Sequence, residues 1–244
     1  MTTVGSIGYG LGNTMSFSHA FHFAGPHGLL TAFTIPDQRD PAPPHILDQL
    51  HPLEKAHALT LGGYRQGQFV GGRLALRGAC AQLQVQPEAI LGDDRGAPVL
   101  PKGYTGSISH KRNIAVGMVG RAEEGMLGVD IEDYGPPRPT IEGAVLCKEE
   151  LDKIADLHGE ARWIAVLQRF SLKEAIYKAV DPYVRRYVGF HEVCVHPDTN
   201  GSAQVRFMLK HGEGPFEVSA KYIWLKGRLL CSARVRVSPH QNHD

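Results

Sequence analysis

The chain has 244 residues, which is enough for one large domain or two small ones. Its formal net charge is +1, so no bulk field favours nucleic acid or a membrane surface as a partner. No stretch approaches the roughly 20 apolar residues of a membrane-spanning helix, and the N-terminus lacks a secretory signal pattern. We therefore expect a cytoplasmic protein with no nucleic-acid or membrane partner.

The cysteines and histidines form no recognisable metal or redox motif. The thirteen histidines include no H-x-x-x-H pair, and the cysteines include no C-x-x-C pair. The four cysteines are Cys80, Cys147, Cys194 and Cys231. This scatter predicts neither a disulfide framework nor a zinc site, and it favours a reducing compartment.

The first half of the chain predicts strands followed by helices. Residues 16–35, with four phenylalanines and two glycines, favour strand and turn, and a proline-rich loop covers 36–44. A helical stretch from 46 to 83 is expected to break at Gly62 and Gly63. The glycines of its second part weaken that helix, because each costs up to ~1 kcal/mol relative to alanine in a helix interior.

The middle of the chain predicts a loop, two strands and an acidic strand end. Residues 91–103 favour a loop, and 107–119 favour strand and turn. After a turn at 121–125, the apolar segment 126–131 predicts a strand that leads into two acids. We expect this strand to form a hairpin with the preceding one.

The last part predicts helices and then antiparallel strands. A proline-rich loop over 133–139 precedes a short helix at 148–157. The clearest helix covers 163–180, and Pro182 is expected to end it. The strands that follow are expected at 189–196, 203–210, 216–225 and 228–237. Helices mixed with antiparallel strands predict an α+β fold.

Asp130 and Glu132 lie two residues apart at the end of a predicted strand. Side chains alternate along a strand, so both carboxylates face the same side. Like charges on one face repel unless a cation lies between them. A magnesium ion fits, since it takes a few oxygen ligands and leaves room for substrate phosphates. The alternative is an ordinary strand end that carries acids into water.

Glu174 continues a row of large apolar residues on the predicted helix 163–180. Residues 163, 167 and 170 form that row, so Glu174 points toward the core rather than to the opposite, solvated face. Lys178 follows one turn later on the same face, and Lys173 precedes Glu174. The alternative is a row that emerges into water, with a surface pair worth about 0.3–0.5 kcal/mol.

The segment 107–112 gathers hydroxyls, an imidazole and two cations. Ser109 and His110 lie in it, and such a cluster at a strand start suits a phosphate. No nucleophile elbow, P-loop or G-x-G-x-x-G sequence accompanies it. Arg65 and Arg73 are eight residues apart, close to one side of a helix, and Arg95 lies in a loop. Taken singly, each arginine is also compatible with an ordinary surface position.

Two motifs together resemble the signature of the 4′-phosphopantetheinyl transferase superfamily. Gly128-Val129-Asp130-Ile131-Glu132 matches its G-[IV]-D-x-E strand. The segment 170–178, Phe-Ser-Leu-Lys-Glu-Ala-Ile-Tyr-Lys, matches its [FW]-[SCT]-x-K-E-[AS]-x-x-K helix at the expected spacing. Residues 106–110 match a further S-[IL]-[ST]-H segment. The monomeric type that activates peptide, polyketide and siderophore synthases is the most similar.

The resemblance implies roles for individual residues. The metal ligands would be Asp130, Glu132 and Glu174, holding Mg²⁺ or Mn²⁺ with the coenzyme A pyrophosphate. Catalysis would involve Glu174, Lys178 and His110, with Glu174 as the candidate base. Coenzyme A would contact Arg65, Arg73, Arg95, Ser109, His110, Lys173 and Lys178.

The resemblance also implies a pseudo-dimer of two similar α/β halves with coenzyme A between them. We expect a loose N-terminus at 1–14, an N-terminal half at 15–122, a C-terminal half at 123–239 and a tail at 240–244. The C-terminal half would hold the metal and dock the carrier protein. The segment 141–163 is where that partner is expected, through apolar Val145 and Leu146 and basic Lys148.

The implied reaction moves 4′-phosphopantetheine from coenzyme A to a serine of an acyl, peptidyl or aryl carrier protein, and releases adenosine 3′,5′-bisphosphate. The enzyme would be a monomer serving polyketide, non-ribosomal peptide or fatty-acid synthases. One alternative is a magnesium-dependent nucleotide pyrophosphohydrolase, although no E-x-x-E-E run lies beside the metal motif. The other is an inactive protein that binds a carrier or a nucleotide.

Overall fold

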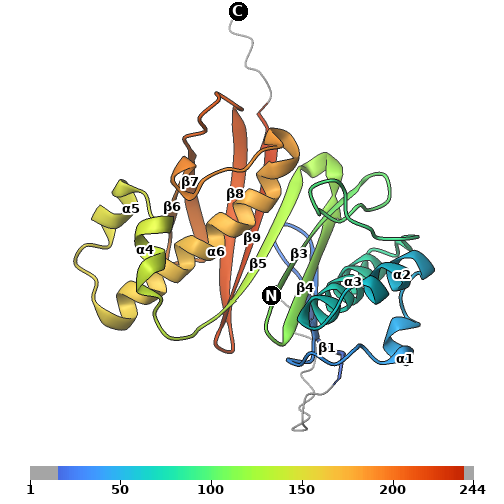
Figure 1. Ribbon diagram of the computed structural model, residues 1–244. Coiled ribbons are helices and arrows are strands. Elements are labelled where there is room, and N and C mark those ends of the chain that lie inside the picture. Colours follow the sequence, from blue (N-terminus) through green and yellow to red (C-terminus); the bar gives the residue numbers. More distant parts are fainter. Residues whose placement is uncertain (1–15, 239–244) are drawn as a thin grey trace, which may run out of the picture. The chain divides into compact units, whose positions relative to one another are not determined.

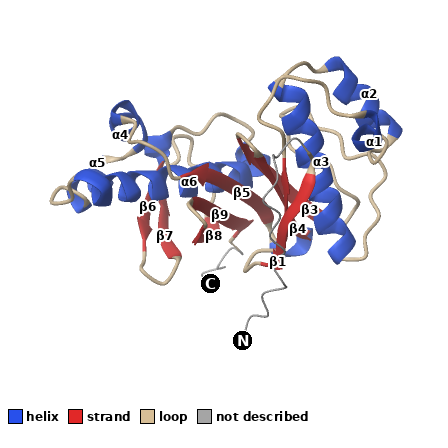
Figure 2. Cartoon of the chain, turned by 90° about the horizontal axis from the view of Figure 1, so that it is seen from below, coloured by secondary structure: helices blue, strands red, loops and turns tan. Residues whose placement is uncertain are grey.

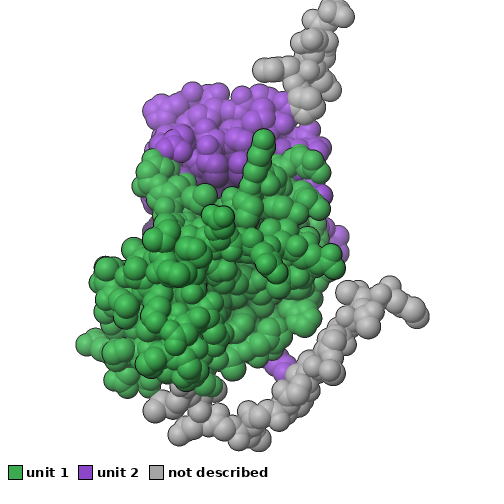
Figure 3. Space-filling view, turned by 90° about the vertical axis from the view of Figure 1, so that its right-hand side faces the viewer, with its two compact units in different colours: residues 1–123 green, residues 124–244 purple. Residues whose placement is uncertain are grey.

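A computed structural model describes residues 16–238 of the chain. The expected loose N-terminus at 1–14 and tail at 240–244 lie outside these residues. The chain divides into two compact units after Glu123, whereas the sequence suggested a junction after residue 122 (Figure 3).

The first unit combines one antiparallel sheet with three helices. Its strands are β1 (Ser18–Ala24), β2 (Leu29–Thr34), β3 (Tyr104–Lys111) and β4 (Ile114–Arg121), in the spatial order β1-β2-β4-β3. Its helices are α1 (Pro44–Leu47), α2 (Pro52–Thr60) and α3 (Tyr64–Gln82), and a 3₁₀ turn, η1 (Ala122–Glu124), spans the boundary to the second unit. The long helix α3 packs on β2 and β4 (Figure 1).

Gly71 and Gly78 of α3 are packing positions rather than helix breaks. A Cβ at Gly71 would lie 2.1 Å from Ile35, and one at Gly78 would lie 2.7 Å from Thr31. The same closeness recurs on the sheet, where a Cβ at Gly117 would lie 2.5 Å from the backbone of Leu76. Helix α3 runs unbroken to Gln82 because its burial on the sheet outweighs the low helix propensity of glycine.

The second unit also combines one long helix with one antiparallel sheet. Its strands are β5 (Met126–Asp133), β6 (Val193–Pro197), β7 (Ser202–Phe207), β8 (Phe216–Leu225) and β9 (Arg228–Val237), in the order β5-β9-β8-β7-β6. Its helices are α4 (Pro139–Val145), α5 (Lys148–Lys153) and α6 (Gly159–Val184), with a 3₁₀ turn η2 (Phe190–Glu192). Helix α6 crosses one face of this sheet (Figures 1 and 2).

The mixture of helices and antiparallel sheets confirms the α+β prediction. The expected hairpin between the acidic strand and its predecessor is wrong, because β5 pairs with β9, with Asp130 opposite Cys231. The turn that seemed to close a hairpin is instead where one unit ends and the next begins.

Helix α6 is longer than expected at both ends, and Pro182 lies inside it. A proline in the last turn removes a single backbone bond, that to the carbonyl of residue 178. The helix therefore continues to Val184 and ends at Arg185, whose φ is 47°. In the described part of the chain, no helix is long and apolar enough to cross a membrane.

Candidate active site

The two motifs meet because a glycine lets α6 rest directly on β5. A Cβ at Gly128 would lie 1.8 Å from the carbonyl oxygen of Ala175. Any side chain at Gly128 would push α6 away from β5. The first residue of the strand motif therefore sets the distance between β5 and the helix that carries the second motif. The contact brings α6 side chains beside Asp130, two residues further along β5.

Asp130 is held by two residues of α6. Ser171 Oγ donates to Asp130 Oδ2 at 2.8 Å, and Lys178 Nζ lies 3.1 Å from Asp130 Oδ1. Lys178 Nζ also donates to the carbonyl of Val129 at 2.8 Å. Asp130 is 7% exposed in its side chain, whereas Lys178 is 31% exposed. The carboxylate is thus fixed from inside, and the ammonium group still reaches solvent.

Glu132 lies on the same face of β5 and is buried. Arg138, at the start of α4, places its Nη2 3.5 Å from Glu132 Oε2 and lies over the rings of Trp163 and Phe170. Cys231, opposite Asp130 on β9, has a thiol pKa raised well above its usual value by burial, with both carboxylates adding to the effect. Asp130 and Glu132 therefore both lie near the Cys231 thiol, on one face of β5 as the alternation of side chains predicts.

Glu174 is neither buried nor fully solvated. It has intermediate exposure on α6, one turn before Lys178. Burial raises the pKa of the neighbouring Tyr177, and the charge of Glu174 raises it further. Tyr177 is in turn fixed by its hydroxyl, which donates to the carbonyl of Gly189 at 3.1 Å. Glu174 thus lies where the apolar row of α6 reaches the surface.

The donor set at β5 and α6 fits a hard divalent cation. Asp130 and Glu132 are nearly fully buried carboxylates, and a buried ionised oxygen requires a cation or donors nearby. Their three-carboxylate set with Glu174 is not among the described clusters whose three ligand atoms lie within 4.8 Å. The ligand atoms of the three carboxylates thus do not all lie within 4.8 Å of one another, and an ion held by one or two of them would complete its shell with waters and substrate oxygens.

Lys173 lies in the interior of the second unit rather than at a surface where a pyrophosphate could reach it. Its side chain is 0% exposed and forms an ion pair of 2.6 Å with Glu150, which is also 0% exposed. Its ammonium group donates further to the carbonyls of Val145 and Phe190 at 2.8 and 2.9 Å. All three N–H donors are used inside the protein, so Lys173 holds α5 and η2 to α6 instead.

Four expected ligand contacts of the first unit are on β3, on α3 and in the loop before β3. Ser109 is buried on β3 and His110, the next residue, is exposed, because neighbours on a strand face opposite sides. Arg65 is exposed in the first turn of α3, and Arg95 is exposed in its loop, where its backbone N–H donates to Asp93 at 2.8 Å.

Arg73 is the fifth residue of the first unit that was expected to contact coenzyme A, and it lies in the interior of that unit. Its Nε donates to the carbonyl of Ile90, its guanidinium lies 4.3 Å from the ring centre of Phe69, and burial lowers its pKa to about 10. Eight residues advance a helix by about 80° beyond two full turns, so Arg65 and Arg73 do not share a side. The expected phosphate anchor is a structural residue.

The expected docking segment also differs from the prediction. Val145 and Leu146 are 1% and 2% exposed and belong to the core of the second unit, so they offer no apolar surface to a partner. Lys148, the first residue of α5, is exposed.

Two residues of the site were not assigned from the sequence. Ser171 lies within the second motif, where its position could have suggested the bond to Asp130. Arg138 lies in a proline-rich stretch that carries no signal, and only the folded chain brings it to Glu132.

Models of one protein family match a segment of each unit. Residues 55–120 match the family model of the 4′-phosphopantetheinyl transferase N-terminal domain. Residues 126–233 match that of the 4′-phosphopantetheinyl transferase superfamily, a range that contains every residue of the β5–α6 contact. The chain belongs to the 4′-phosphopantetheinyl transferase superfamily.

Two curated relatives are named 4′-phosphopantetheinyl transferases. The 4′-phosphopantetheinyl transferase PptT of Mycobacterium tuberculosis is 31% identical over 140 residues, which are 57% of this chain and 61% of that protein. The 4′-phosphopantetheinyl transferase Svp of Streptomyces mobaraensis is 31% identical over 163 residues, which are 64% of this chain and 65% of that one. The matches thus span less than two thirds of these relatives' lengths.

Among solved structures, a holo-(acyl-carrier-protein) synthase from Bacillus anthracis in complex with CoA aligns with a TM-score of 0.37 and 22% identity. The alignment covers 46% of this chain and 96% of that one. This likeness is too slight to support an argument about the site.

Proposed function

We propose that this chain transfers 4′-phosphopantetheine from coenzyme A to a serine hydroxyl of a carrier protein. The observation that carries the proposal is that Ser171 and Lys178 of the helix motif both hydrogen-bond to Asp130 of the strand motif. Both motifs lie in the range that matches the superfamily model. The serine oxygen forms a bond to the phosphorus that bears pantetheine, the bond from that phosphorus to the bridging oxygen breaks, and adenosine 3′,5′-bisphosphate leaves.

Asp130, Glu132 and Glu174 are the residues that would hold Mg²⁺, and Mn²⁺ would suit the same oxygens. The ion supplies positive charge beside the pyrophosphate when bound. Ser171 fixes Asp130 from within the protein, so the orientation of this ligand does not depend on the metal.

Glu174 is our candidate for the base that accepts the proton of the attacking serine. Its intermediate exposure lets it contact a partner's side chain, whereas the buried Asp130 and Glu132 are less accessible. Proton transfer to a positioned carboxylate commonly contributes about 10²–10⁴-fold to a rate.

Lys178 would neutralise charge on the pyrophosphate as its bond breaks, and Arg138 joins it as a second cation. Both are partly exposed, at 31% and 45%, and both lie beside a buried carboxylate. A substrate phosphate near these carboxylates meets a fixed positive group at each, which is the electrostatic arrangement that phosphoryl transfer requires.

Residues of the first unit would contact the rest of coenzyme A. Exposed His110, Arg65 and Arg95 suit the nucleotide phosphates, and Ser109 neighbours His110 on β3. We leave Arg73 and Lys173 out of this set, because both are buried in contacts within their own units.

The protein partner would be an acyl, peptidyl or aryl carrier domain of a polyketide, non-ribosomal peptide or fatty-acid synthase. Exposed Lys148 at the start of α5 suits an acidic carrier helix. We propose that the enzyme acts as a monomer in the cytoplasm. Charge reversal in Lys148→Glu should raise the KM for the carrier, and an unchanged KM would remove Lys148 from the docking surface.

The test is the intact mass of a purified apo carrier protein after incubation with this chain, coenzyme A and Mg²⁺. A metal-dependent gain of one phosphopantetheine group, lost with a chelator and in Glu174→Gln, is the expected result. Several carrier classes should be tried, since the structure does not select one. Release of adenosine 3′,5′-bisphosphate without carrier modification would point to a pyrophosphohydrolase, and tight coenzyme A binding without turnover would point to a binding protein.

A further inference from the structure

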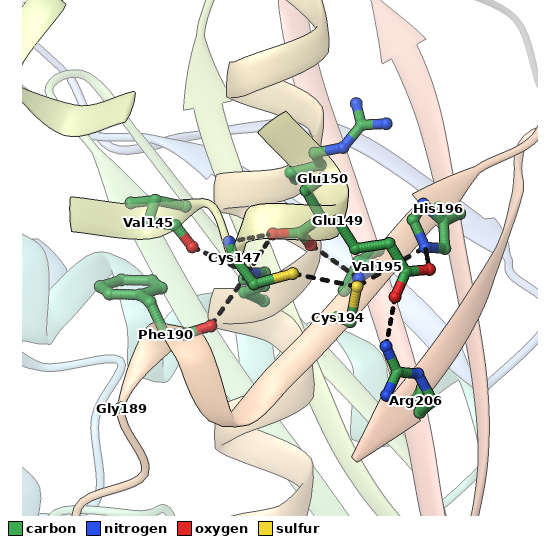
Figure 4. A network of polar contacts seen from close by, with 12 residues as sticks. Val145, Cys147, Glu149, Glu150, Gly189, Phe190, Cys194, Val195, His196 and Arg206 are labelled. Carbon is green, nitrogen blue, oxygen red and sulfur yellow. Dashed lines mark hydrogen bonds and ion pairs between the residues drawn. The ribbon is translucent and has the colours of Figure 1, made fainter. Parts of the chain in front are cut away.

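Two cysteines that are far apart in the sequence meet in the second unit, away from the Asp130 contact. Cys147 immediately precedes α5 and Cys194 lies on β6, 47 residues later, yet their Sγ atoms are 3.1 Å apart (Figure 4). No disulfide joins them, and both are free thiols. The pair has no part in the proposed transfer reaction.

An imidazole and a carboxylate adjoin the thiols. His196, two residues after Cys194 and hence on the same face of β6, has its Nε2 3.5 Å from Cys194 Sγ. Glu149, in the first turn of α5, has its Oε1 2.8 Å from the same nitrogen. Ligand atoms of Glu149, Cys194 and His196 all lie within 4.8 Å of one another (Figure 4).

A second carboxylate nearby is already committed elsewhere. Glu150 lies within 4.8 Å of the two sulfurs, but its Oε2 accepts from Lys173 Nζ and from the backbone N–H of Cys147. Its Oε1 accepts from the backbone N–H of Val195 at 2.7 Å. Glu150 therefore fixes the backbone on both sides of the thiols. The exposed Glu149, which contacts His196 and Arg206, is the carboxylate that can turn toward a ligand.

We propose that Cys147, Cys194, His196 and Glu149 form a structural zinc site that joins the start of α5 to β6. Two sulfurs, one imidazole nitrogen and one carboxylate oxygen are ligands that Zn²⁺ takes in tetrahedral geometry. Four protein ligands leave no open position, which distinguishes a structural zinc site from a catalytic one.

One donor distance already matches that geometry. Cys147 shares a close group with Cys194 but not with Glu149 and His196, so the other distances must change when an ion binds. With Zn–S near 2.3 Å and Zn–N near 2.05 Å, a tetrahedral zinc holds sulfur and nitrogen about 3.6 Å apart and two sulfurs about 3.8 Å apart. The observed 3.5 Å between Cys194 and His196 agrees with the first value. The 3.1 Å between the sulfurs must widen, and the exposed Glu149 must draw in from its ion pair with Arg206.

The charges around the cluster bear on what occupies it. Burial, with the hydrogen bond from Cys147 and the negative Glu150 adding to it, raises the pKa of the Cys194 thiol to about 12. A zinc ion would displace both thiol protons to solvent. The two thiolates, Glu149 and Glu150 would then place four negative charges beside the five positive charges of zinc, Arg206, Lys173 and the buried Arg169.

Cobalt substitution tests the site in the full chain. The protein is reduced, stripped with a chelator and titrated with Co²⁺ and then with Zn²⁺. We expect one equivalent of cobalt to give a thiolate charge-transfer band with intense tetrahedral d–d bands, and zinc to bleach both. Cobalt at the Asp130 carboxylates would give only the weak bands of an oxygen-rich site, so the two sites are distinguishable.

Variants of the partly exposed ligands decide the outcome. His196→Asn and Glu149→Gln should weaken cobalt binding at least about 10-fold while circular dichroism confirms folding, and Cys147→Ser should abolish the charge-transfer band. Cys80→Ala, which removes a thiol from the first unit, should change neither. The proposal would be overturned if cobalt gave no charge-transfer band with the stripped wild type, or if His196→Asn left the band unaltered. It would also be overturned if Cys147 and Cys194 formed a disulfide in air instead of binding metal.

Discussion

Lys173 and Lys178 lie five residues apart in the same motif of α6, yet their surroundings are opposite. Lys173 and its partner Glu150 are both 0% exposed, and the lysine makes its hydrogen bonds within the protein. Lys178 is 31% exposed and contacts a carboxylate that we assign to metal binding. The comparison teaches that a motif lysine serves substrate or structure according to which face of the helix it occupies.

The largest effect should come from breaking the site beside Lys178. Asp130→Asn keeps an acceptor for Ser171 but removes the charge that faces Lys178 and the metal. We expect the transfer rate to fall about 10³-fold, with little change in the free energy of unfolding. The matched control is Asp133→Asn on the same strand, which removes a partner of Arg228 and should leave the rate unchanged. Equal losses in both variants would contradict a specific role for Asp130.

The next effect concerns stability around Lys173. Lys173→Met leaves Glu150 as a buried charge without its cation and should lower the free energy of unfolding by about 3–5 kcal/mol. Adding Glu150→Gln should restore part of that loss, because no unbalanced charge remains. Urea unfolding of the single and double variants measures this, with exposed Lys153→Met as the control. A single variant as stable as the wild type would show that the pair is not structural.

A smaller effect should follow from separating α6 and β5. Gly128→Ala places a methyl group against the carbonyl of Ala175 and should cost about 1–3 kcal/mol of stability. The shift should also lower the transfer rate, since Ser171 and Lys178 would move away from Asp130. Gly135→Ala, where a Cβ meets nothing within 4 Å, is the control for both measurements. A fully active, fully stable Gly128→Ala would mean that close approach is not needed.

The smallest effect is acid sensitivity near the residues that hold Lys173. In η2, hydrogen bonds from Arg186 lower the pKa of Glu192 to about 2 from its usual 4.5. A depressed carboxylate pKa stabilises the fold above pH 4.5 and loses that contribution as pH falls toward 2. Glu192→Gln should remove about 1 kcal/mol of stability at neutral pH and flatten the acid limb of the stability curve.

Acid unfolding followed by circular dichroism checks this, with the exposed Glu217→Gln, a partner of Arg236, as the control. An acid limb of the same slope in Glu192→Gln and wild type would assign the acid sensitivity to other carboxylates.

Much of the fold could be predicted from local pattern. The α+β class, the break near Gly62 and the strands β8 and β9 followed from turn residues and apolar alternation. Strand pairing could not, because the partner of β5 lies about a hundred residues away and the sequence offered a nearer, wrong neighbour. The glycines of α3 misled for a related reason, since propensity carries no information about the sheet against which a helix packs.

The same division holds for the candidate site. Motif spacing brought Asp130, Glu132, Glu174 and Lys178 to attention, and the structure places them along the β5–α6 contact. Burial separated Lys173 and Arg73 from the site, and burial depends on the whole fold rather than on spacing. The scattered cysteines likewise gave no hint that Cys147 and Cys194 would meet.

The most direct test of the account measures the transfer rate per folded molecule for Lys178→Gln and for Lys173→Met with Glu150→Gln. We predict that Lys178→Gln loses at least about 10²-fold in kcat while its unfolding free energy stays within about 1 kcal/mol of wild type. The Lys173 and Glu150 double variant should be less stable but should keep its kcat within a few-fold. An active Lys178→Gln, or a folded double variant without activity, would contradict the division between the two lysines.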